Sequence, residues 1–186
     1  MFKYALLIIF AVAASLTATA QAQVTAAQSP YLMAAQSGSA YGQNQYGGGA
    51  QQPYTNNYQT PYVRIINRWK PDQSLNIEYG NVQAGLSQYQ WHSADWTFER
   101  VDGQHYRIKN RWKNTYLHNQ YQNLQTGPIQ PGWWSAMWIV ESAAPGFFRV
   151  RNRWTNDYLH NEYGAVTLGT IQPNWHSAMW ELRGFR

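Results

Sequence analysis

The sequence predicts an all-β domain made of three copies of one unit of roughly 42 residues. The first sign is the triplet Asn-Arg-Trp, which begins at Asn67, Asn110 and Asn152, at intervals of 43 and 42 residues. The second sign is a block of the form Trp-x-Ser-Ala-x-Trp, which ends at Trp96, Trp138 and Trp180. Two blocks that recur at a fixed spacing are a strong indication of internal repetition.

The opening block of each copy has the pattern of a half-buried strand. One position stays apolar in all three copies, as Ile65, Ile108 and Val150. The next position tolerates very different residues, as Ile66, Lys109 and Arg151. Because side chains alternate between the two faces of a strand, this pattern predicts one buried and one solvent-facing side. Each copy as a whole is typical of about four short strands, and its richness in aromatic and β-branched residues disfavours a helical repeat.

Three such units suit a threefold barrel capped by hairpins, which is the β-trefoil architecture. One unit alone cannot close a core, whereas three can. Three blades would fall short of the usual minimum of four for a propeller. We therefore predict a β-trefoil over residues 62–186, with repeats over 62–104, 105–146 and 147–186.

The internal alignment also predicts burial. The tryptophans that end the second block should lie in the core. Strand alternation places three further tryptophans on the core side, at Trp69, Trp112 and Trp154. Asp95 stands where the other copies have Met137 and Met179, so we expect this face to reach water. A glycine that recurs between the blocks predicts a turn at Gly85, Gly127 and Gly169.

The N-terminal part differs from the repeats. Residues 1–22 have the pattern of a secretory signal peptide, with Lys3, then an apolar run from Tyr4 to Ala14, then small residues. The run is too short to span a bilayer comfortably, so we expect a secreted or periplasmic protein with no membrane span after the signal peptide is cleaved. The absence of cysteine excludes a lipoprotein, zinc sites built on thiolates and thiol catalysis.

Residues 23–61 carry no charge and are rich in Gln, Gly and Tyr. They have few aliphatic residues and no periodicity, so we expect a disordered tail that acts as a tether. Tyrosines spaced among Gln and Asn are also typical of segments that self-associate, and both roles stay open.

The repeat domain resembles the ricin B-type β-trefoil lectins. The resemblance covers Tyr62 to Arg186 and is carried by three copies of the right length and an apolar-x-apolar opening strand. It is also carried by a Tyr-Leu step into the second strand, as in Tyr116-Leu117, and by an x-x-Trp ending. The family usually ends this motif as Gln-x-Trp, whereas all three copies here have Ala-x-Trp.

The resemblance implies one shallow sugar pocket in each repeat. The family's pocket acid, which accepts bonds from sugar hydroxyls, falls on Asn76, His118 and His160. The stacking ring falls on Trp91, Trp133 and Trp175, and the polar residues just before it are Gln88, Gln130 and Gln172. Further polar candidates are Glu78, Gln120, Glu162, Ser93, Ser135 and Ser177. None of the copies has the acid, so a sugar pocket here would use His or Asn together with these neighbours.

Basic residues suggest a second kind of site. They recur on the outward side of the first strand of each repeat, at Arg64, Arg68, Arg107, Lys109, Arg111, Arg149, Arg151 and Arg153. Such a stripe could bind an anionic polymer, or it could be a solvated face with arginines stacked on neighbouring rings.

No catalytic motif is present, so we predict that the protein is not an enzyme and needs no cofactor. The five histidines lack the spacing of a metal site. We expect an exported carbohydrate-binding module with up to three weak sites that bind a glycan or polysaccharide. The alternative is a structural, matrix or cell-surface protein that binds an anionic polymer or a protein through its arginine and aromatic surface. The oligomeric state stays open.

Overall fold

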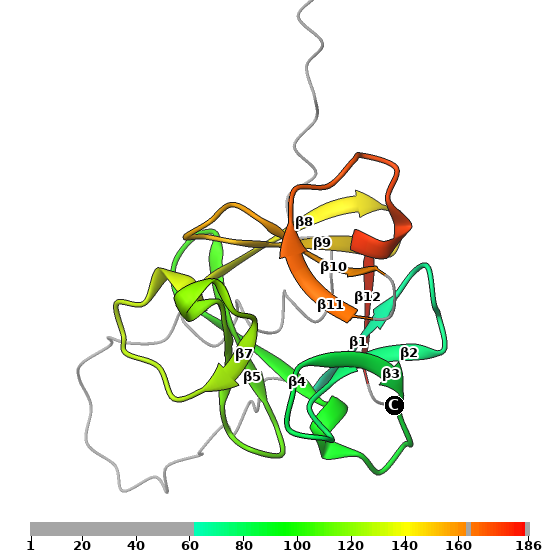
Figure 1. The fold of residues 1–186 in the computed structure, drawn as a ribbon, viewed down its shortest axis with the longest axis horizontal. Helices are drawn as coiled ribbons and strands as arrows, with labels where there is room; N and C mark the ends of the chain where they lie inside the picture. The colour runs from blue at the N-terminus through cyan, green and yellow to red at the C-terminus, as the bar shows by residue number, and fades with distance from the viewer. Residues whose placement is uncertain (1–61, 163–164, 185–186) are drawn as a thin grey trace, which may run out of the picture.

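The computed structural model describes residues 62–162 and 165–184, which form a twelve-stranded sheet with three short 3-10 turns at equivalent places (Figure 1). The predicted signal peptide over 1–22 and the predicted tail over 23–61 lie outside the described residues. Within the part of the chain that the structure describes, no helix is long and apolar enough to cross a membrane.

Four strands fall in each predicted repeat. The first repeat has β1 (Val63–Asn67), β2 (Gln73–Asn76), β3 (Gln83–Leu86) and β4 (Trp96–Arg100). The second has β5 (His105–Asn110), β6 (Tyr116–His118), β7 (Gln125–Gly127) and β8 (Trp138–Ala144). The third has β9 (Phe147–Asn152), β10 (Tyr158–Glu162), β11 (Ala165–Gly169) and β12 (Trp180–Gly184). The three equivalent 3-10 turns are η2 (His92–Ala94), η4 (Trp134–Ala136) and η5 (His176–Ala178), and each precedes the last strand of its repeat. A further 3-10 turn, η3 (Gln120–Gln122), lies between β6 and β7.

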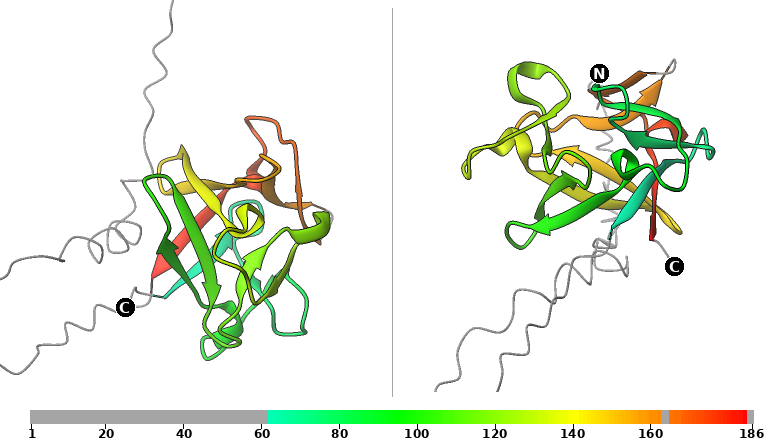
Figure 2. Two further views of the ribbon diagram at one scale, coloured as in Figure 1. Left: turned by 90° about the vertical axis from the view of Figure 1, so that its left-hand side faces the viewer. Right: turned by 90° about the horizontal axis from the view of Figure 1, so that it is seen from below.

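The first and last strands of the repeats close into a barrel. Antiparallel pairs join β1 to β4, β4 to β5, β5 to β8, β8 to β9, β9 to β12 and β12 back to β1. The middle strands form the hairpins β2–β3, β6–β7 and β10–β11, which lie around the same axis (Figures 1 and 2). A six-stranded barrel with three hairpins is the predicted β-trefoil, so the fold prediction is confirmed.

The closing tryptophans form the centre of the core, as predicted. Trp96, Trp138 and Trp180 are fully buried. Each indole Nε1 donates a hydrogen bond to a backbone oxygen 21 residues earlier in the chain, at Leu75, Leu117 or Leu159, over 2.8–2.9 Å. The donors are therefore satisfied, which makes the burial of so large a polar-tipped ring favourable.

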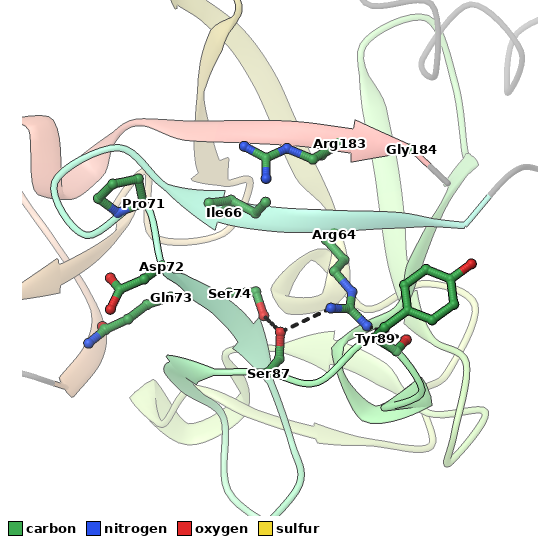
Figure 3. A pocket seen from close by; sticks show the side chains of 10 residues that line it. All are labelled: Arg64, Ile66, Pro71, Asp72, Gln73, Ser74, Ser87, Tyr89, Arg183 and Gly184. Carbon is green, nitrogen blue, oxygen red and sulfur yellow. Dashed lines mark hydrogen bonds between the residues drawn. The ribbon is translucent and has the colours of Figure 1, made fainter. Parts of the chain in front are cut away.

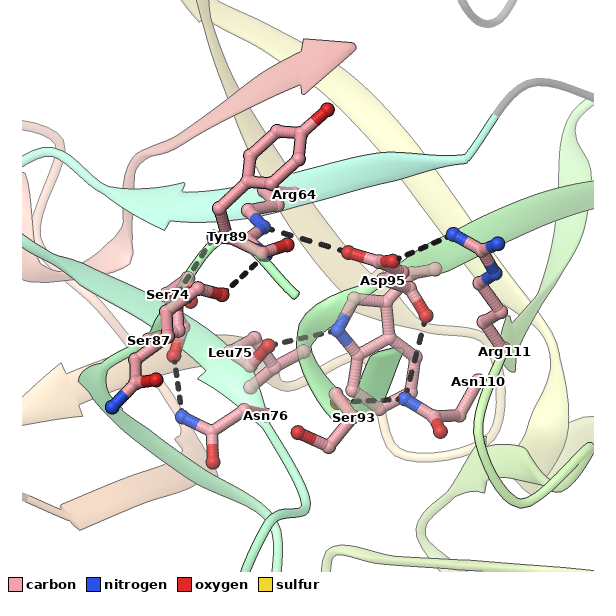
Figure 4. Close-up of polar contacts among 12 residues, drawn as sticks. Arg64, Ser74, Leu75, Asn76, Ser87, Tyr89, Ser93, Asp95, Asn110 and Arg111 are labelled. Carbon is pink, nitrogen blue, oxygen red and sulfur yellow. Dashed lines mark hydrogen bonds and ion pairs between the residues drawn. The ribbon is translucent and has the colours of Figure 1, made fainter. Parts of the chain in front are cut away.

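The prediction for the position before these tryptophans is wrong. Asp95, Met137 and Met179 are all buried rather than solvent-facing. Asp95 is tolerated because two guanidinium groups flank it, with Arg64 Nε 3.4 Å from Oδ1 and Arg111 Nη1 3.1 Å from Oδ2 (Figure 4). A buried charge of this kind persists only when it is paired and hydrogen-bonded.

The prediction for the tryptophans of the Asn-Arg-Trp triplet is also wrong. Trp69, Trp112 and Trp154 are 50%, 46% and 46% exposed. Alternation does not reach them, because the strand ends at the asparagine two residues earlier. That asparagine is buried, and its side-chain oxygen accepts the backbone N–H of the tryptophan and of the next residue. The chain therefore turns there and carries the indole outward.

The recurring glycines lie in strands and not in turns. Gly85, Gly127 and Gly169 belong to β3, β7 and β11. A Cβ atom at Gly127 would stand 3.0 Å from Nε2 of His118, and one at Gly169 would stand 3.1 Å from Nε2 of His160. In the second and third repeats, the glycine therefore makes room for an imidazole on the neighbouring strand.

Candidate functional site

The seam between two consecutive repeats brings an exposed tryptophan next to the 3-10 turn of the preceding repeat. At the seam between the second and third repeats, Asn152 Nδ2 donates to the backbone oxygen of Ser135 over 2.9 Å. The backbone N–H of Arg153 donates to the oxygen of Met137 over 2.9 Å. These bonds place Trp154 beside η4. Asn67 and Asn110 make the same kind of bond to Ser177 and Ser93 at the other seams, so the arrangement recurs three times.

An aromatic hollow of about 290 Å³ lies at the seam between the second and third repeats. Its lining residues are Gln120, Gly132, Trp133, Trp134, Ser135 and Trp154. Trp134 and Trp154 are about half exposed, and the guanidinium carbon of Arg153 lies 4.4 Å from a ring centroid of Trp134. A stacked cation limits the freedom of that indole. We call this hollow the Trp134–Trp154 cleft.

Polar groups adjoin the indole faces of the cleft. Ser135 Oγ donates a hydrogen bond to Gln120 Oε1 over 2.6 Å, so the carboxamide is held in one orientation with its amide hydrogens left as donors. In the first repeat, Ser93 donates in the same way to the carboxylate of Glu78. Flat rings next to oriented hydrogen-bonding groups can stack on the C–H face of a sugar and fix its hydroxyls.

A buried histidine supports the back of this site. The imidazole of His118 meets Trp133 edge to face, with ring centroids 5.8 Å apart. Its Nδ1 accepts the backbone N–H of Gln120 over 3.3 Å, so the neutral tautomer carries its proton on Nε2. Burial lowers the pKa of His118. His160 has the same packing against Trp175 at 6.1 Å, and burial lowers its pKa although the charges of nearby acids oppose the shift.

The structure places the residues at the family's acid position on the inside of the domain. Asn76 is fully buried, and its side chain already bonds the backbone of Ser74 and Glu78 and the amide of Gln83. His118 and His160 are 5% and 8% exposed. Their direct contact with a ligand stays a prediction, and their observed contacts support the aromatic wall instead.

The other predicted ligand residues are spread along each seam. Gln88, Gln130 and Gln172 are exposed, and their backbone oxygens accept the N–H of Trp91, Trp133 and Trp175 over 3.1 Å. These three tryptophans, Glu78, Gln120 and Glu162 are half-buried, whereas Ser93, Ser135 and Ser177 are buried. The cleft thus brings together Gln120, Trp133 and Ser135 of the predicted set.

The basic residues of the opening strands are engaged within the domain. The first arginine of each strand donates to backbone oxygens of the loop before the 3-10 turn, as Arg64 to Gln88 and Tyr89, Arg107 to Pro131, and Arg149 to Pro173. The later ones contact acids or sulfur, as Lys109 with Glu99, Arg111 with Asp95, Arg151 with Glu141, and Arg153 with Met137 and Asp102. Many donors of the stripe are thus engaged within the domain, although Arg107 and Arg149 bond neutral backbone oxygens and keep their charge, and binding of an anion by the stripe stays a prediction.

Sequence reasoning missed Trp134 and Trp154. The signal for Trp134 was its place in the block, where the other copies have His92 and His176. The signal for Trp154 was hidden by strand alternation, which wrongly assigned it to the core. Among the described residues, no group of three or more His, Asp or Glu side chains could hold a metal ion.

No protein-family model and no curated protein matches the chain. Several solved structures do. A GlcNAcα1-4Gal-releasing endo-β-galactosidase from Clostridium perfringens matches 71% of this chain at 26% identity, with a TM-score of 0.61. A designed threefold-symmetric protein, ThreeFoil, matches 67% at 16% identity, also with a TM-score of 0.61. Polyporus squamosus lectin, bound to the epitope Neu5Acα2-6Galβ1-4GlcNAc, matches 67% at 15% identity, with a TM-score of 0.59.

The matched part differs among these structures. This chain covers 35% of the galactosidase and 49% of the lectin, but 99% of the designed protein. The common part is the β-trefoil. The described domain therefore has the β-trefoil fold.

Proposed function

We propose that this protein is a non-catalytic carbohydrate-binding module that uses the Trp134–Trp154 cleft. The observation that carries the proposal is the cleft itself, where two half-exposed indoles stand beside the oriented amide of Gln120. Apolar ring faces with a few fixed polar groups are the usual means of sugar recognition. The lectin among the similar structures, which is bound to the epitope Neu5Acα2-6Galβ1-4GlcNAc, supports the same ligand class.

The threefold repeat supports up to three such sites. The equivalents of Trp154 are Trp112 and Trp69, and the equivalents of Trp134 are His92 and His176. The second seam has an indole where the others have an imidazole, so we expect the second seam to bind most tightly. Weak sites on one domain gain avidity on a polymeric glycan. An exported location and a tethering tail over residues 23–61 complete the proposal as expectations from the sequence.

A glycan array with the full chain tests the proposal. We expect binding to at least one glycan family, and a loss of about fivefold or more in Trp154→Ala, because stacking on an indole face contributes at least about 1 kcal/mol. Trp112→Ala and Trp69→Ala are matched controls at equivalent exposed positions, and we expect smaller losses from them.

Two outcomes would reject this function. A folded protein that binds no glycan would reject it outright. Binding that disappears at high salt but survives Trp154→Ala would favour the anionic-polymer alternative, because screening weakens contacts between exposed charges and leaves stacking nearly unchanged.

A further inference from the structure

A second hollow, of about 480 Å³, lies at the opposite end of the β2–β3 hairpin from Asn76. Its walls come from β1, the β1–β2 loop, the start of β2, the loop after β3, and β12 (Figure 3). Its lining includes Ile66, Asp72, Gln73, Ser74, Ser87, Tyr89 and Arg183. The hollow shares no residue with the Trp134–Trp154 cleft. We call it the Ser74 hollow.

The hollow lies where the first repeat lacks a cluster that the other two repeats have. In the second repeat, Lys109 stands opposite Tyr116, whose hydroxyl donates to Glu99 over 2.9 Å. The third repeat has the same set in Arg151, Tyr158 and Glu141. At the equivalent positions the first repeat has Ile66 opposite Ser74, and β12 supplies Arg183 opposite Arg64. A serine in place of a tyrosine leaves the space open.

The hydrogen-bonding groups of the hollow are not saturated. Ser87 Oγ accepts from Ser74 Oγ over 2.6 Å and from Arg64 over 3.3 Å, so its own proton remains a donor. Gln73 Oε1 accepts from Asn161, which leaves its amide hydrogens as donors. The exposed carboxylate of Asp72 has no hydrogen-bond or ion-pair partner within residues 62–162 and 165–184, and it can accept two or more bonds.

The two arginines of the hollow are already paired with acids, so they do not favour an anionic ligand. Arg64 is paired with Asp95, and Arg183 is paired with Glu181 through two hydrogen bonds of 2.9 and 2.7 Å. The fork of Arg183 still has donors on its second terminal nitrogen. Figure 3 shows Asp72 at one end of the hollow and the ring of Tyr89, which is 76% exposed, at the other.

We propose that the Ser74 hollow is a fourth binding site, which takes one neutral hexose unit of a glycan. Asp72 would accept hydroxyl protons, Ser87, Gln73 and Arg183 would donate to ring and hydroxyl oxygens, and Tyr89 would cover a C–H face. A carboxylate, which is missing at Asn76, His118 and His160, is thus present at a different place on Asp72. The inference rests on the proposed function for its ligand class alone, because the two sites are separate.

The test uses two variants of the full chain. Ser74→Tyr fills the hollow with the side chain that the other repeats carry at this position, so the fold should accept it. Asp72→Asn removes only an exposed charge and controls for any misfolding of the first variant. Trp154→Ala is the matched variant of the other site. The probes are galactose, glucose and mannose, and glucuronate and glucosamine serve as charged comparisons. Binding of each sugar is measured from the shifts of backbone amide signals in two-dimensional NMR.

We expect at least one neutral hexose to shift the amides of Ser74, Ser87 and Arg183 saturably, at a Kd of about 1 mM. Ser74→Tyr and Asp72→Asn should each weaken this binding by about tenfold or more, while Trp154→Ala leaves it unchanged. No saturable shift with any neutral hexose, saturation by a charged sugar alone, or undiminished binding in Ser74→Tyr would overturn the inference. Shifts confined to the Trp134–Trp154 cleft would support the proposed function and reject the fourth site. Shifts confined to the Ser74 hollow would support the fourth site and reject sugar binding in the Trp134–Trp154 cleft.

Discussion

The first repeat and the other two repeats share one backbone plan but differ in three polar clusters. The first repeat has Asp95 where the others have a buried methionine, and Asn76 where the others have a buried histidine. It has Ser74 where the others have a tyrosine. The arginine of the opening strand is constant, and its Nε bonds Asp95 in the first repeat. In the other repeats, Nε of Arg107 and of Arg149 is buried without a partner among the described residues. The same backbone position therefore holds a satisfied arginine Nε in the first repeat and an unsatisfied one in the other two.

The largest expected effect comes from removing the buried carboxylate of the first repeat. Asp95→Ala leaves the guanidiniums of Arg64 and Arg111 without their anion, and we expect a loss of about 3–5 kcal/mol in the free energy of unfolding. Urea denaturation followed by tryptophan fluorescence measures it. Asp95→Met imports the residue of the other repeats and should cost clearly less. Equal losses in both variants would show that the ion pair adds nothing specific.

A smaller effect should follow from filling the space beside a buried imidazole. Gly127→Ala brings a Cβ to within 3.0 Å of His118, which is fixed under Trp133, so we expect a loss of about 1–2 kcal/mol. Gly85→Ala is the matched control, because its Cβ would stand 3.7 Å from Asn76, which is ordinary contact. Adding His118→Asn to Gly127→Ala should restore stability, and a failure to do so would place the strain elsewhere.

The buried histidines should make stability depend on pH. Burial lowers the pKa of His118 and of His160, so the unfolded chain takes up these protons at a higher pH than the folded domain. Their contribution is complete above the unfolded pKa of about 6.5 and is lost as the pH falls through the folded values. We expect Tm to fall between about pH 7.5 and about pH 5. The double variant His118→Asn, His160→Asn has the first repeat's residue and should show a weaker fall, and an unchanged slope would contradict this.

The smallest effect on stability should come from the surface cluster of Lys109, Tyr116 and Glu99, which has no counterpart in the first repeat. Lys109 Nζ lies 3.5 Å from Glu99, and both side chains are partly exposed. Glu99→Gln removes the charge but keeps an oxygen for the hydroxyl of Tyr116, so we expect a loss below about 1 kcal/mol. Denaturation at low and high salt measures it. The difference between variant and parent should shrink at high salt, and a loss above about 2 kcal/mol would mean that the cluster matters more than a surface pair does.

The sequence by itself determined the threefold repeat, the strands and the innermost core. Recurrence of Asn-Arg-Trp and of the closing block indicates equivalent units. Trp138 is buried as the internal alignment predicts, although the neighbouring position, which was expected to face water, is buried as well. The position of the Trp134–Trp154 cleft was not accessible in this way. Strand alternation holds only within a strand, and β9 ends at Asn152. The direction of the Trp154 side chain is therefore set by the turn that follows Asn152 and not by the strand.

Only the tertiary structure decided which polar groups are satisfied. Asp95 looked like a solvent-facing residue until two arginines from different strands were seen around it. The glycines looked like turns until the imidazoles beside them were seen. The Ser74 hollow depends on Arg183 of the last strand lying against the first, a pairing that closes the barrel. Each of these features joins residues that are distant along the chain, and their partners are fixed by closure of the barrel rather than by local pattern.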